Sequence, residues 1–195
     1  EPESVKKGDV ITRQNESGDC FYVIVNGEAT VEQYDEMEEQ LNCLDYLKPR
    51  DSFGEDALVT GENRRVTITM KTDGTLLKLR REDFDRLLSK PLVNRVQPDV
   101  AKSLLDNDGY ALLDVRIEDE IELYGQIPNS ILSPVDELHI NISRLKSVGK
   151  PFVIYCRSGK RSALAAMRLA QYDIKAVSLD GGIKKWPYEK EGGFL

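Results

Sequence analysis

The sequence predicts two domains of different fold class: an α+β domain built as a β jelly roll with short helices, then an α/β domain with a parallel sheet. In the first half of the chain, short strand-like runs follow one another and are separated by turn residues. In the second half, apolar runs alternate with helix-like segments, as they do around a parallel sheet. A length of 195 residues is enough for two such domains with separate cores.

Composition limits the function classes. The formal net charge is −7 and there is no basic run, which argues against nucleic acid and against an anionic membrane as partners. No apolar run approaches the roughly 18 residues of a membrane-spanning helix. Three cysteines cannot all pair, and without any sign of secretion they predict a reducing, cytoplasmic location. The chain starts without Met and without a signal peptide, so we expect an N-terminally truncated fragment.

The N-terminal half reads as a series of short strands. We expect strands over residues 10–13, 21–25, 28–34, 41–47, 66–70 and 75–79. The last two are predicted to pair as a hairpin across residues 72–74. Many short antiparallel strands at this spacing are typical of a jelly roll or a barrel. The acidic run 35–39 is expected to be a solvated loop, and Cys20 and Cys43 are expected to be core or half-buried packing residues.

One segment, residues 52–67, interrupts this strand pattern. Gly54 precedes a short helix predicted over residues 55–59, and a polar loop then ends at Arg64. A glycine at a helix start lets a phosphate approach the backbone N–H groups. An arginine can bind the same phosphate through two donors, and a carboxylate can accept hydrogen bonds from a sugar hydroxyl. The segment therefore has the residue types of a sugar-phosphate site.

The same segment resembles the phosphate-binding cassette of cyclic-nucleotide-binding domains. The preceding GDCFYVIVNGEATV, residues 18–31, resembles that family's strand pair with its two turn glycines, and the resemblance covers residues 5–88. It implies cyclic AMP or cyclic GMP as a regulatory ligand, with Glu55 on the ribose 2′-hydroxyl and Arg64 on the phosphate. The implied binding residues are Gly54, Glu55, Ala57, Arg64 and Arg65.

Departures from the family pattern leave two questions open. Arg65 and Val66 replace small residues after the phosphate arginine, so the choice between the two nucleotides is not readable. A single helix is predicted over residues 81–89, which leaves little room for the family's helical lid. Either the second domain supplies the lid, or nucleotide binding is weak or lost. In the latter case Glu55 and Arg64 would form a surface salt bridge.

Residues 90–99 are the predicted linker, and we place the two domains at 1–96 and 97–195. A proline near each end makes the linker semi-rigid, so the domains are expected to be held close. His139, the one histidine, is expected to be structural or exposed. In the second half we expect a strand over 111–115 and helices over 100–107, 118–124 and 136–145.

The stretch 151–171 combines a strand, a cysteine and a helix. The apolar run 152–155 predicts a buried strand, and the Ala- and Leu-rich run 162–171 predicts a helix. Cys156 lies between them, where backbone N–H groups and the positive end of the helix dipole favour its thiolate. The alternative is an inert buried cysteine that packs as a small hydrophobe.

CRSGKRSA, residues 156–163, resembles the active-site loop of single-domain rhodaneses, which are sulfurtransferases. LLDVR at 112–116 and LDGGIKKW at 179–186 resemble two further motifs of that family, whereas GQIPNS at 125–130 matches its turn less well. The resemblance covers most of the second half and implies a rhodanese-like α/β fold.

It also implies a two-step reaction. The Cys156 thiolate attacks the outer sulfur of a small anionic, thiosulfate-like donor, and the persulfide then passes its sulfur to a thiol or cyanide acceptor. Neither a cofactor nor a metal is implied for sulfur transfer. Backbone N–H groups of the loop would cradle the persulfide, and its three cations would attract the donor. The implied catalytic residues are Cys156, Arg157, Ser158, Gly159, Lys160 and Arg161.

Two alternatives remain. A sister class of phosphatases places an arginine six positions after the cysteine, but this chain has Ser162 there and its arginine at Arg161, so the smaller loop favours sulfur. The second alternative is a non-enzymatic, cyclic-nucleotide-responsive regulatory or binding protein, in which Cys156 acts as a persulfide relay or redox sensor.

Overall fold

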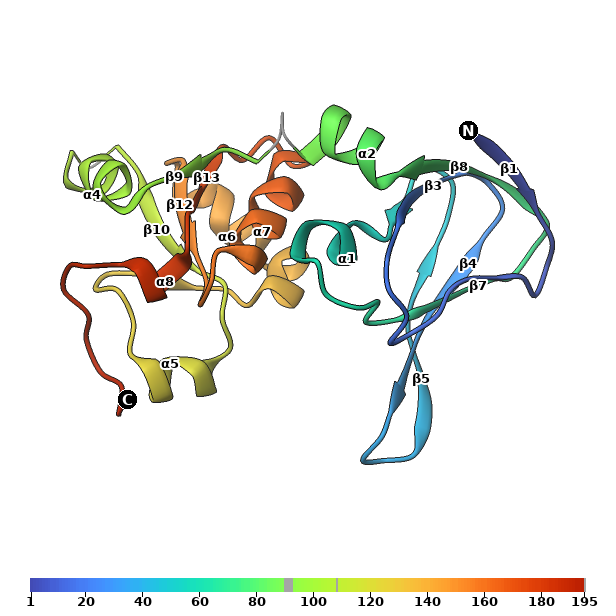
Figure 1. The fold of residues 1–195 in the computed structure, drawn as a ribbon, viewed down its shortest axis with the longest axis horizontal. Coiled ribbons are helices and arrows are strands. Elements are labelled where there is room, and N and C mark those ends of the chain that lie inside the picture. Colours follow the sequence, from blue (N-terminus) through green and yellow to red (C-terminus); the bar gives the residue numbers. More distant parts are fainter. Residues whose placement is uncertain (90–92, 108, 195) are drawn as a thin grey trace. The chain divides into compact units, whose positions relative to one another are not determined.

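The computed structural model describes residues 1–89, 93–107 and 109–194. By its internal contacts the chain divides into two compact units, Glu1–Leu88 and Ser89–Leu195, and each is described by itself (Figure 1). Within the described residues, no helix combines the length and the apolar character that crossing a membrane requires.

Two antiparallel four-stranded sheets form the N-terminal unit. The strands of the first are β1 (Pro2–Val5), β3 (Cys20–Asn26), β6 (Ser52–Phe53) and β8 (Gly74–Arg80). The strands of the second are β2 (Val10–Thr12), β4 (Ala29–Asp35), β5 (Gln40–Leu47) and β7 (Thr67–Met70). The strand orders are β1-β8-β3-β6 and β2-β7-β4-β5.

Side chains from both sheets meet in one apolar core. Ile24 on β3 and Leu76 on β8 come from the first sheet, and Ile68 and Met70 on β7 come from the second. On β7 the two buried residues alternate with half-buried threonines, which is the period of a strand with one face on a core. The unit is therefore jelly-roll-like, as predicted, with two packed sheets and not one closed barrel.

The predicted hairpin of residues 66–70 and 75–79 is wrong. β7 pairs with β2 and β4, whereas β8 pairs with β1 and β3, so the two strands lie in opposite sheets. The connecting turn is bound by other segments. The Glu28 N–H donates to Thr72 Oγ1 at 3.0 Å, and the Lys7 N–H donates to the Asp73 carboxylate at 2.9 Å. These bonds hold the turn where the chain crosses from one sheet to the other.

Strands β1 and β6 were not expected from the sequence. Three of the four residues of β1 are exposed, and it lies at the edge of its sheet, so it lacks the apolar alternation that marks a strand. β6 has only two residues and pairs with β3 just before the helix that follows it. Both depend on pairing with distant strands, which a local pattern does not encode.

The β4–β5 hairpin extends away from the remainder of its unit (Figure 1). β5 is an edge strand and is largely exposed. Cys43, which lies on it, is exposed, so the prediction of core or half-buried packing is wrong for this residue. Cys20, the first residue of β3, is buried as expected. The acidic run 35–39 forms the exposed turn of the hairpin apart from half-buried Asp35.

Two short helical segments complete the N-terminal unit. Helix α1 (Glu55–Thr60) confirms the helix expected over 55–59. Helix α2 (Arg81–Phe84) continues as a π-helical turn, Asp85–Ser89, so the helix expected over 81–89 is present in two forms. Phe84 anchors α2 because it is fully buried and its ring lies 5.3 Å from that of Phe21 on β3.

A five-stranded parallel sheet forms the centre of the C-terminal unit. Its strands are β9 (Arg95–Val96), β10 (Ala111–Asp114), β11 (Ile131–Leu132), β12 (Phe152–Tyr155) and β13 (Ala176–Leu179). Their order is β11-β10-β12-β13-β9, and all four pairings are parallel. All four residues of the central strand β12 are buried, as expected for a strand covered on both faces.

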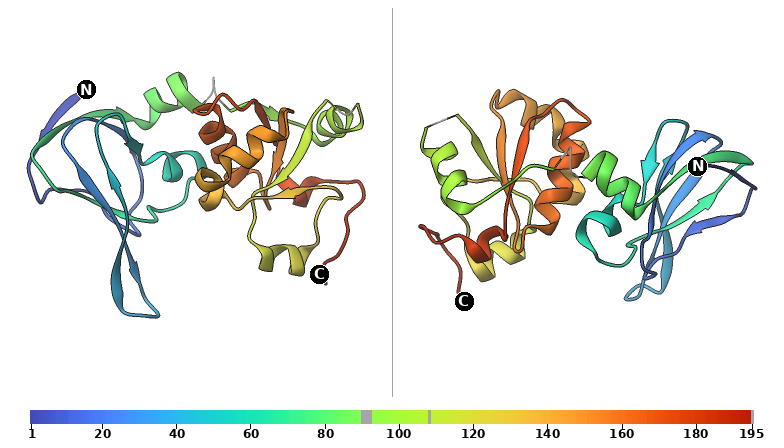
Figure 2. Two further views of the ribbon diagram at one scale, coloured as in Figure 1. Left: turned by 180° about the vertical axis from the view of Figure 1, so that it is seen from behind. Right: turned by 45° about the horizontal axis from the view of Figure 1, so that its top comes forward.

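Helices cover both faces of this sheet. The α-helices described in this unit are α4 (Pro98–Asp106), α5 (Glu118–Tyr124), α6 (Leu138–Ser147), α7 (Lys160–Ala170) and α8 (Gly182–Lys185). α6 and α7 lie on one face and α4 on the other (Figure 2). Ala101 of α4 and Ile183 of α8 share a core with Val153 and Val177 of the sheet. The predicted parallel α/β fold is confirmed.

The segment expected as a linker is in part a strand. Within 90–99, residues Arg95 and Val96 form β9 and pair with β13 at the edge of the C-terminal sheet. Residues 90–92 of this segment lie outside the described residues, as does Asp108, which follows the helix predicted over 100–107. That helix is α4, which starts earlier because Pro98 occupies its first turn.

Candidate functional site

Cys156 lies directly after the buried strand β12, at the carboxyl edge of the sheet. A short loop leads from it to Gly159, which caps α7 with a left-handed φ of 89°. A side chain at Gly159 would place Cβ 2.9 Å from the Gly181 backbone nitrogen, so the turn requires glycine. The chain thereby folds the first turn of α7 back toward the sulfur.

Backbone N–H groups of this turn point at the thiol. The Gly159 N–H donates to Cys156 Sγ at 3.2 Å, and the Ser162 N–H donates to it at 3.4 Å. As a thiol, Cys156 donates through its S–H to Ser162 Oγ at 3.7 Å. Cys156 is only 1% exposed. The sulfur is thus enclosed, but its surroundings supply hydrogen-bond donors and not only apolar groups.

The glycine pair at the start of α8, Gly181 and Gly182, supports the same loop. Ile183 N–H donates to the Cys156 carbonyl at 2.8 Å, and Lys184 N–H donates to the Arg157 carbonyl at 3.2 Å. A Cβ on Gly182 would lie 2.2 Å from the Cys156 carbonyl oxygen. Backbone therefore packs on backbone here, which explains why two glycines follow the last strand.

Helix α5 engages two of the loop cations. Both terminal nitrogens of Arg161 donate to the Glu120 carboxylate at 2.6 Å, and the Arg157 guanidinium lies 4.2 Å from the centre of the Tyr124 ring. Burial raises the pKa of the Glu120 carboxyl, but hydrogen bonds from Arg161 and its charge outweigh this and lower the pKa below its usual value. Arg161 therefore braces the loop against α5. Lys160 and Ser158 are exposed.

A buried ion pair lies below the loop. Arg116 Nη2 donates to Asp114 Oδ2 at 2.6 Å and to the Gly125 carbonyl at 2.8 Å, and neither side chain of the pair is exposed. The Tyr155 hydroxyl accepts from the Ile127 N–H at 3.1 Å. Burial raises the pKa of Tyr155 well above its usual value, so its hydroxyl stays neutral. These contacts fix the strand ends beside Cys156.

In the N-terminal unit, three predicted binding residues come together at the start of α1. Gly54 caps the helix with a left-handed φ of 91°. A Cβ on Gly18 would lie 2.4 Å from Ala57 Cβ and 2.9 Å from Arg64 Cζ, so both residues pack against that glycine. Glu55 is half-buried and Arg65 is exposed.

Arg64 is bound to backbone carbonyl groups. Its Nη1 donates to the Gly54 carbonyl and its Nη2 to the Cys20 carbonyl, both at 2.6 Å, and the residue is 7% exposed. A guanidinium has five N–H donors, and these two bonds occupy two of them. Arg64 thus holds the cassette loop closed onto β3.

Sequence reasoning missed three residues of these sites. Arg81 of α2 donates to the Leu58 carbonyl at 3.0 Å and to the Gly18 carbonyl at 2.8 Å, so it ties α1 to α2. Glu120 and Ser162 contact the Cys156 loop. A serine in the first turn of the predicted helix and a run of acidic residues after DVR were the available signals.

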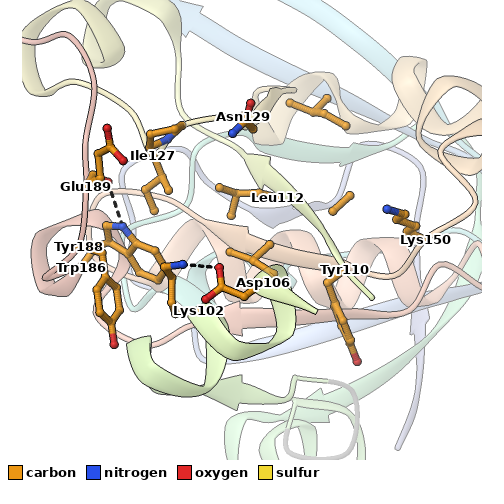
Figure 3. Close-up of a pocket in the computed structure, with 14 residues that line it drawn as sticks. Lys102, Asp106, Tyr110, Leu112, Ile127, Asn129, Lys150, Trp186, Tyr188 and Glu189 are labelled. Carbon is orange, nitrogen blue, oxygen red and sulfur yellow. Dashed lines mark hydrogen bonds and ion pairs between the residues drawn. The ribbon is translucent and has the colours of Figure 1, made fainter. Parts of the chain in front are cut away.

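A separate pocket of about 480 Å³ lies in the C-terminal unit (Figure 3), and its lining residues do not include those of the Cys156 loop. Buried Leu112, Ile127 and Trp186 line it, and the Trp186 indole donates to the Glu189 carbonyl at 3.2 Å. At its rim Lys102 and Asp106 form an ion pair one turn apart on α4. These two charges are thus paired with each other.

Sequence comparison agrees with this division. Residues 2–90 match the family model of the cyclic nucleotide-binding domain, and residues 97–189 match that of the rhodanese-like domain. The chain is a cyclic nucleotide-binding domain followed by a rhodanese-like domain. The Cys156 loop belongs to the rhodanese-like domain and the Arg64 cassette to the cyclic nucleotide-binding domain.

Among curated proteins, the chain is similar to the cAMP-dependent protein kinase regulatory subunit of Dictyostelium discoideum, with 37% identity over 45% of this chain and 27% of that protein. It is also similar to the cGMP-dependent protein kinase egl-4 of Caenorhabditis briggsae, with 39% identity over 42% of this chain and 11% of that protein. The chain thus spans about a quarter or less of these relatives.

Among solved structures, the regulatory domain of Toxoplasma gondii PKA with cAMP matches with a TM-score of 0.44 and 20% identity. The match covers 54% of this chain and 39% of that one.

Proposed function

We propose that the rhodanese-like domain is a thiosulfate sulfurtransferase-like enzyme that carries sulfur as a persulfide on Cys156. The observation that supports this most is the pair of N–H groups, of Gly159 and Ser162, aimed at Cys156 Sγ. Donors at a helix start stabilise a thiolate and any anion that replaces it. Arg157 and Lys160 attract the anionic donor, while Arg161, bound by Glu120, keeps the loop in shape.

The reaction has two displacements. The Cys156 thiolate attacks the outer sulfur of thiosulfate, a new S–S bond forms, and sulfite leaves with the electron pair of the broken bond. Negative charge then lies on the outer sulfur of the persulfide, where the loop amides bind it. A thiol acceptor, as its thiolate, or cyanide attacks this sulfur, and Cys156 leaves as the thiolate. No net proton transfer to the enzyme is required, which suits a site without a histidine.

A thiocyanate assay tests this function. The protein is mixed with thiosulfate and cyanide, and thiocyanate is followed over time. Wild type is expected to turn over, Cys156→Ser to be inactive, and Cys43→Ser to match wild type because Cys43 is an exposed thiol on β5 of the other unit. Absence of turnover, or turnover that survives Cys156→Ser, contradicts the proposal.

We further propose that the cyclic nucleotide-binding domain takes cyclic AMP or cyclic GMP as a regulatory ligand. The phosphate would lie at the start of α1, against Gly54 and Ala57, and would use Arg64 donors that the two carbonyl groups do not occupy. Glu55 would accept from the ribose 2′-hydroxyl. The similarity to a cAMP-dependent protein kinase regulatory subunit and to a cGMP-dependent protein kinase supports this ligand class.

Thermal unfolding tests nucleotide binding. Millimolar cyclic AMP or cyclic GMP is expected to raise the Tm of wild type, since ligand that binds only the folded state stabilises it by mass action. Arg64→Ala is expected to lose the shift. If neither nucleotide changes the Tm of wild type, this part of the proposal is wrong.

A further inference from the structure

A serine side chain lies buried in the C-terminal sheet. Ser178 is on β13, an interior strand, and is 0% exposed. Its neighbours Val177 and Leu179 belong to the apolar core on one face, so alternation directs Ser178 to the other face, where α7 packs. A buried hydroxyl without a partner is costly, and alanine would fill this position without that cost. We therefore expect the Ser178 hydroxyl to have a function that alanine could not fulfil.

The partner of Ser178 leads to the reactive cysteine. Ser178 Oγ and Ser162 Oγ are 2.9 Å apart, and Ser162 Oγ is 3.7 Å from Cys156 Sγ. All three side chains belong to residues that are at most 1% exposed. They form one chain of hydrogen-bonding groups that runs from β13 through the first turn of α7 to the sulfur.

The number of protons available to Ser178, Ser162 and Cys156 decides whether their hydrogen bonds favour the thiol or the thiolate form of Cys156. Each hydroxyl has one proton to donate, a thiol has one, and a thiolate has none. With a thiolate, Ser178 donates to Ser162 and Ser162 donates to the sulfur, so two protons fill two links. With a thiol, three protons compete for the same two links, and one buried O–H or S–H is left without an acceptor in this chain. Such an unmade bond costs free energy.

We propose that Ser178 is a positioning residue that orients the Ser162 hydroxyl as a third donor to Cys156, and that this two-hydroxyl chain stabilises the thiolate. The inference deepens the proposed sulfurtransferase function, on which it rests for its purpose. In the second displacement Cys156 is the leaving group, and a better stabilised thiolate leaves faster. The two hydroxyls therefore serve both the attacking and the leaving sulfur.

The charged groups around the loop are separate from this chain. Arg157, Lys160 and Arg161 lie on the loop and α7, and Glu120 on α5 binds Arg161. From β9, Arg95 Nη1 donates to the Gly159 carbonyl at 3.1 Å. All five are retained when a serine of the chain is replaced. A change in the thiolate fraction of Cys156 in these variants therefore reflects the loss of a hydroxyl group and not the loss of a charge.

The test is the pH dependence of Cys156 alkylation by iodoacetamide, read on its peptide by mass spectrometry. Ser162→Ala is expected to lower the thiolate fraction at fixed pH about tenfold, since it removes a hydrogen bond to a charged group. Ser178→Ala is expected to lower it about threefold through loss of orientation. The double variant is expected to match Ser162→Ala, because Ser178 acts only through Ser162.

A matched pair separates the hydroxyl from packing. Ser178→Thr keeps the hydroxyl group, and Ser178→Val has the shape of threonine without that group. Ser178→Thr is expected to retain the wild-type alkylation profile, and Ser178→Val is expected to behave like Ser178→Ala. Equal profiles for Thr and Val, an unchanged profile in Ser178→Ala, or additive effects in the double variant would overturn the inference. Alkylation needs no sulfur donor. A shifted pH profile of alkylation without any thiocyanate formation would therefore contradict the sulfurtransferase function but support the role of the two hydroxyl groups.

Discussion

Gly54 and Gly159 occupy similar places in the two units, because each has a left-handed φ and precedes a helix. Their surroundings differ. After Gly159, N–H groups bind Cys156, a residue of the same loop, so that site is complete without a ligand. Beside Gly54, the charged residue Arg64 donates to two carbonyl groups, and these bonds occupy two of its five N–H donors. In the cysteine loop the anion is the Cys156 thiolate, which is part of the protein. At the cassette the anion would be the phosphate of a bound nucleotide.

The buried ion pair of Asp114 and Arg116 supports the cysteine loop. Breaking this pair is expected to lower the free energy of unfolding more than any other change considered below. Asp114→Asn leaves the Arg116 charge buried without its counter-ion. We expect a loss of about 3–5 kcal/mol in unfolding free energy, measured by urea unfolding. The surface pair of Arg86 and Asp83 is the control, and Asp83→Asn should have a much smaller effect because both residues of this pair are exposed to solvent. Similar losses in both would contradict a special role for the buried pair.

Glycine contacts give the next effect. Gly182→Ala would place Cβ 2.2 Å from the Cys156 carbonyl oxygen, and we expect a loss of about 2–4 kcal/mol together with reduced thiocyanate formation. Gly149 also has a positive φ, but nothing lies within 4 Å of an added Cβ. Gly149→Ala should therefore cost only about 1 kcal/mol and leave activity intact. Equal costs would show that φ alone, and not backbone packing on the loop, requires Gly182.

Arg64→Ala should have a smaller effect on stability than Asp114→Asn. It leaves the Gly54 and Cys20 carbonyl groups without their donors, at a cost of about 1–3 kcal/mol. Calorimetric unfolding would measure this cost without nucleotide. If Arg64→Ala proves neutral, the carbonyl bonds do not hold the cassette, and the contrast between the two sites weakens.

The smallest expected effect concerns the ion pair between Arg161 and Glu120 at the cysteine loop. The pKa of Glu120 is lowered in the folded state, so its contribution to stability is present above the unfolded pKa and is lost as pH falls through the folded pKa. We expect Glu120→Gln to lose about 1 kcal/mol near neutral pH and to converge with wild type in acid. A Tm series across that pH range measures the difference. A difference that grows in acid has the wrong sign for this account.

Most of the fold was predictable because its signals are local. The apolar run of β12, the Ala-rich α7 and the glycine before α1 mark their elements directly. The hairpin error arose because the Asp73 and Gly74 turn fits a two-stranded connection locally, while its hydrogen bonds to Lys7 and Glu28 come from distant segments. Strands β1 and β9 likewise exist only through their partners.

The sites were predictable at the level of residue types but not of partners. The motif around Cys156 identifies the nucleophile. No local sequence pattern predicts that Arg161 forms an ion pair with Glu120 or that Ser178 hydrogen-bonds with Ser162. For Arg64 the sequence indicates a phosphate ligand, whereas its two carbonyl bonds appear only in three dimensions. The boundaries 1–96 and 97–195 and the cytoplasmic location stay predictions.

The most direct test of the central claim is a peptide mass spectrum after treatment with thiosulfate. We expect a gain of one sulfur atom on the peptide that contains Cys156, reversed by cyanide, and no gain on the peptide that contains the exposed Cys43. A folded protein whose Cys156 peptide gains no sulfur, or gains no more than the Cys43 peptide, would contradict the account.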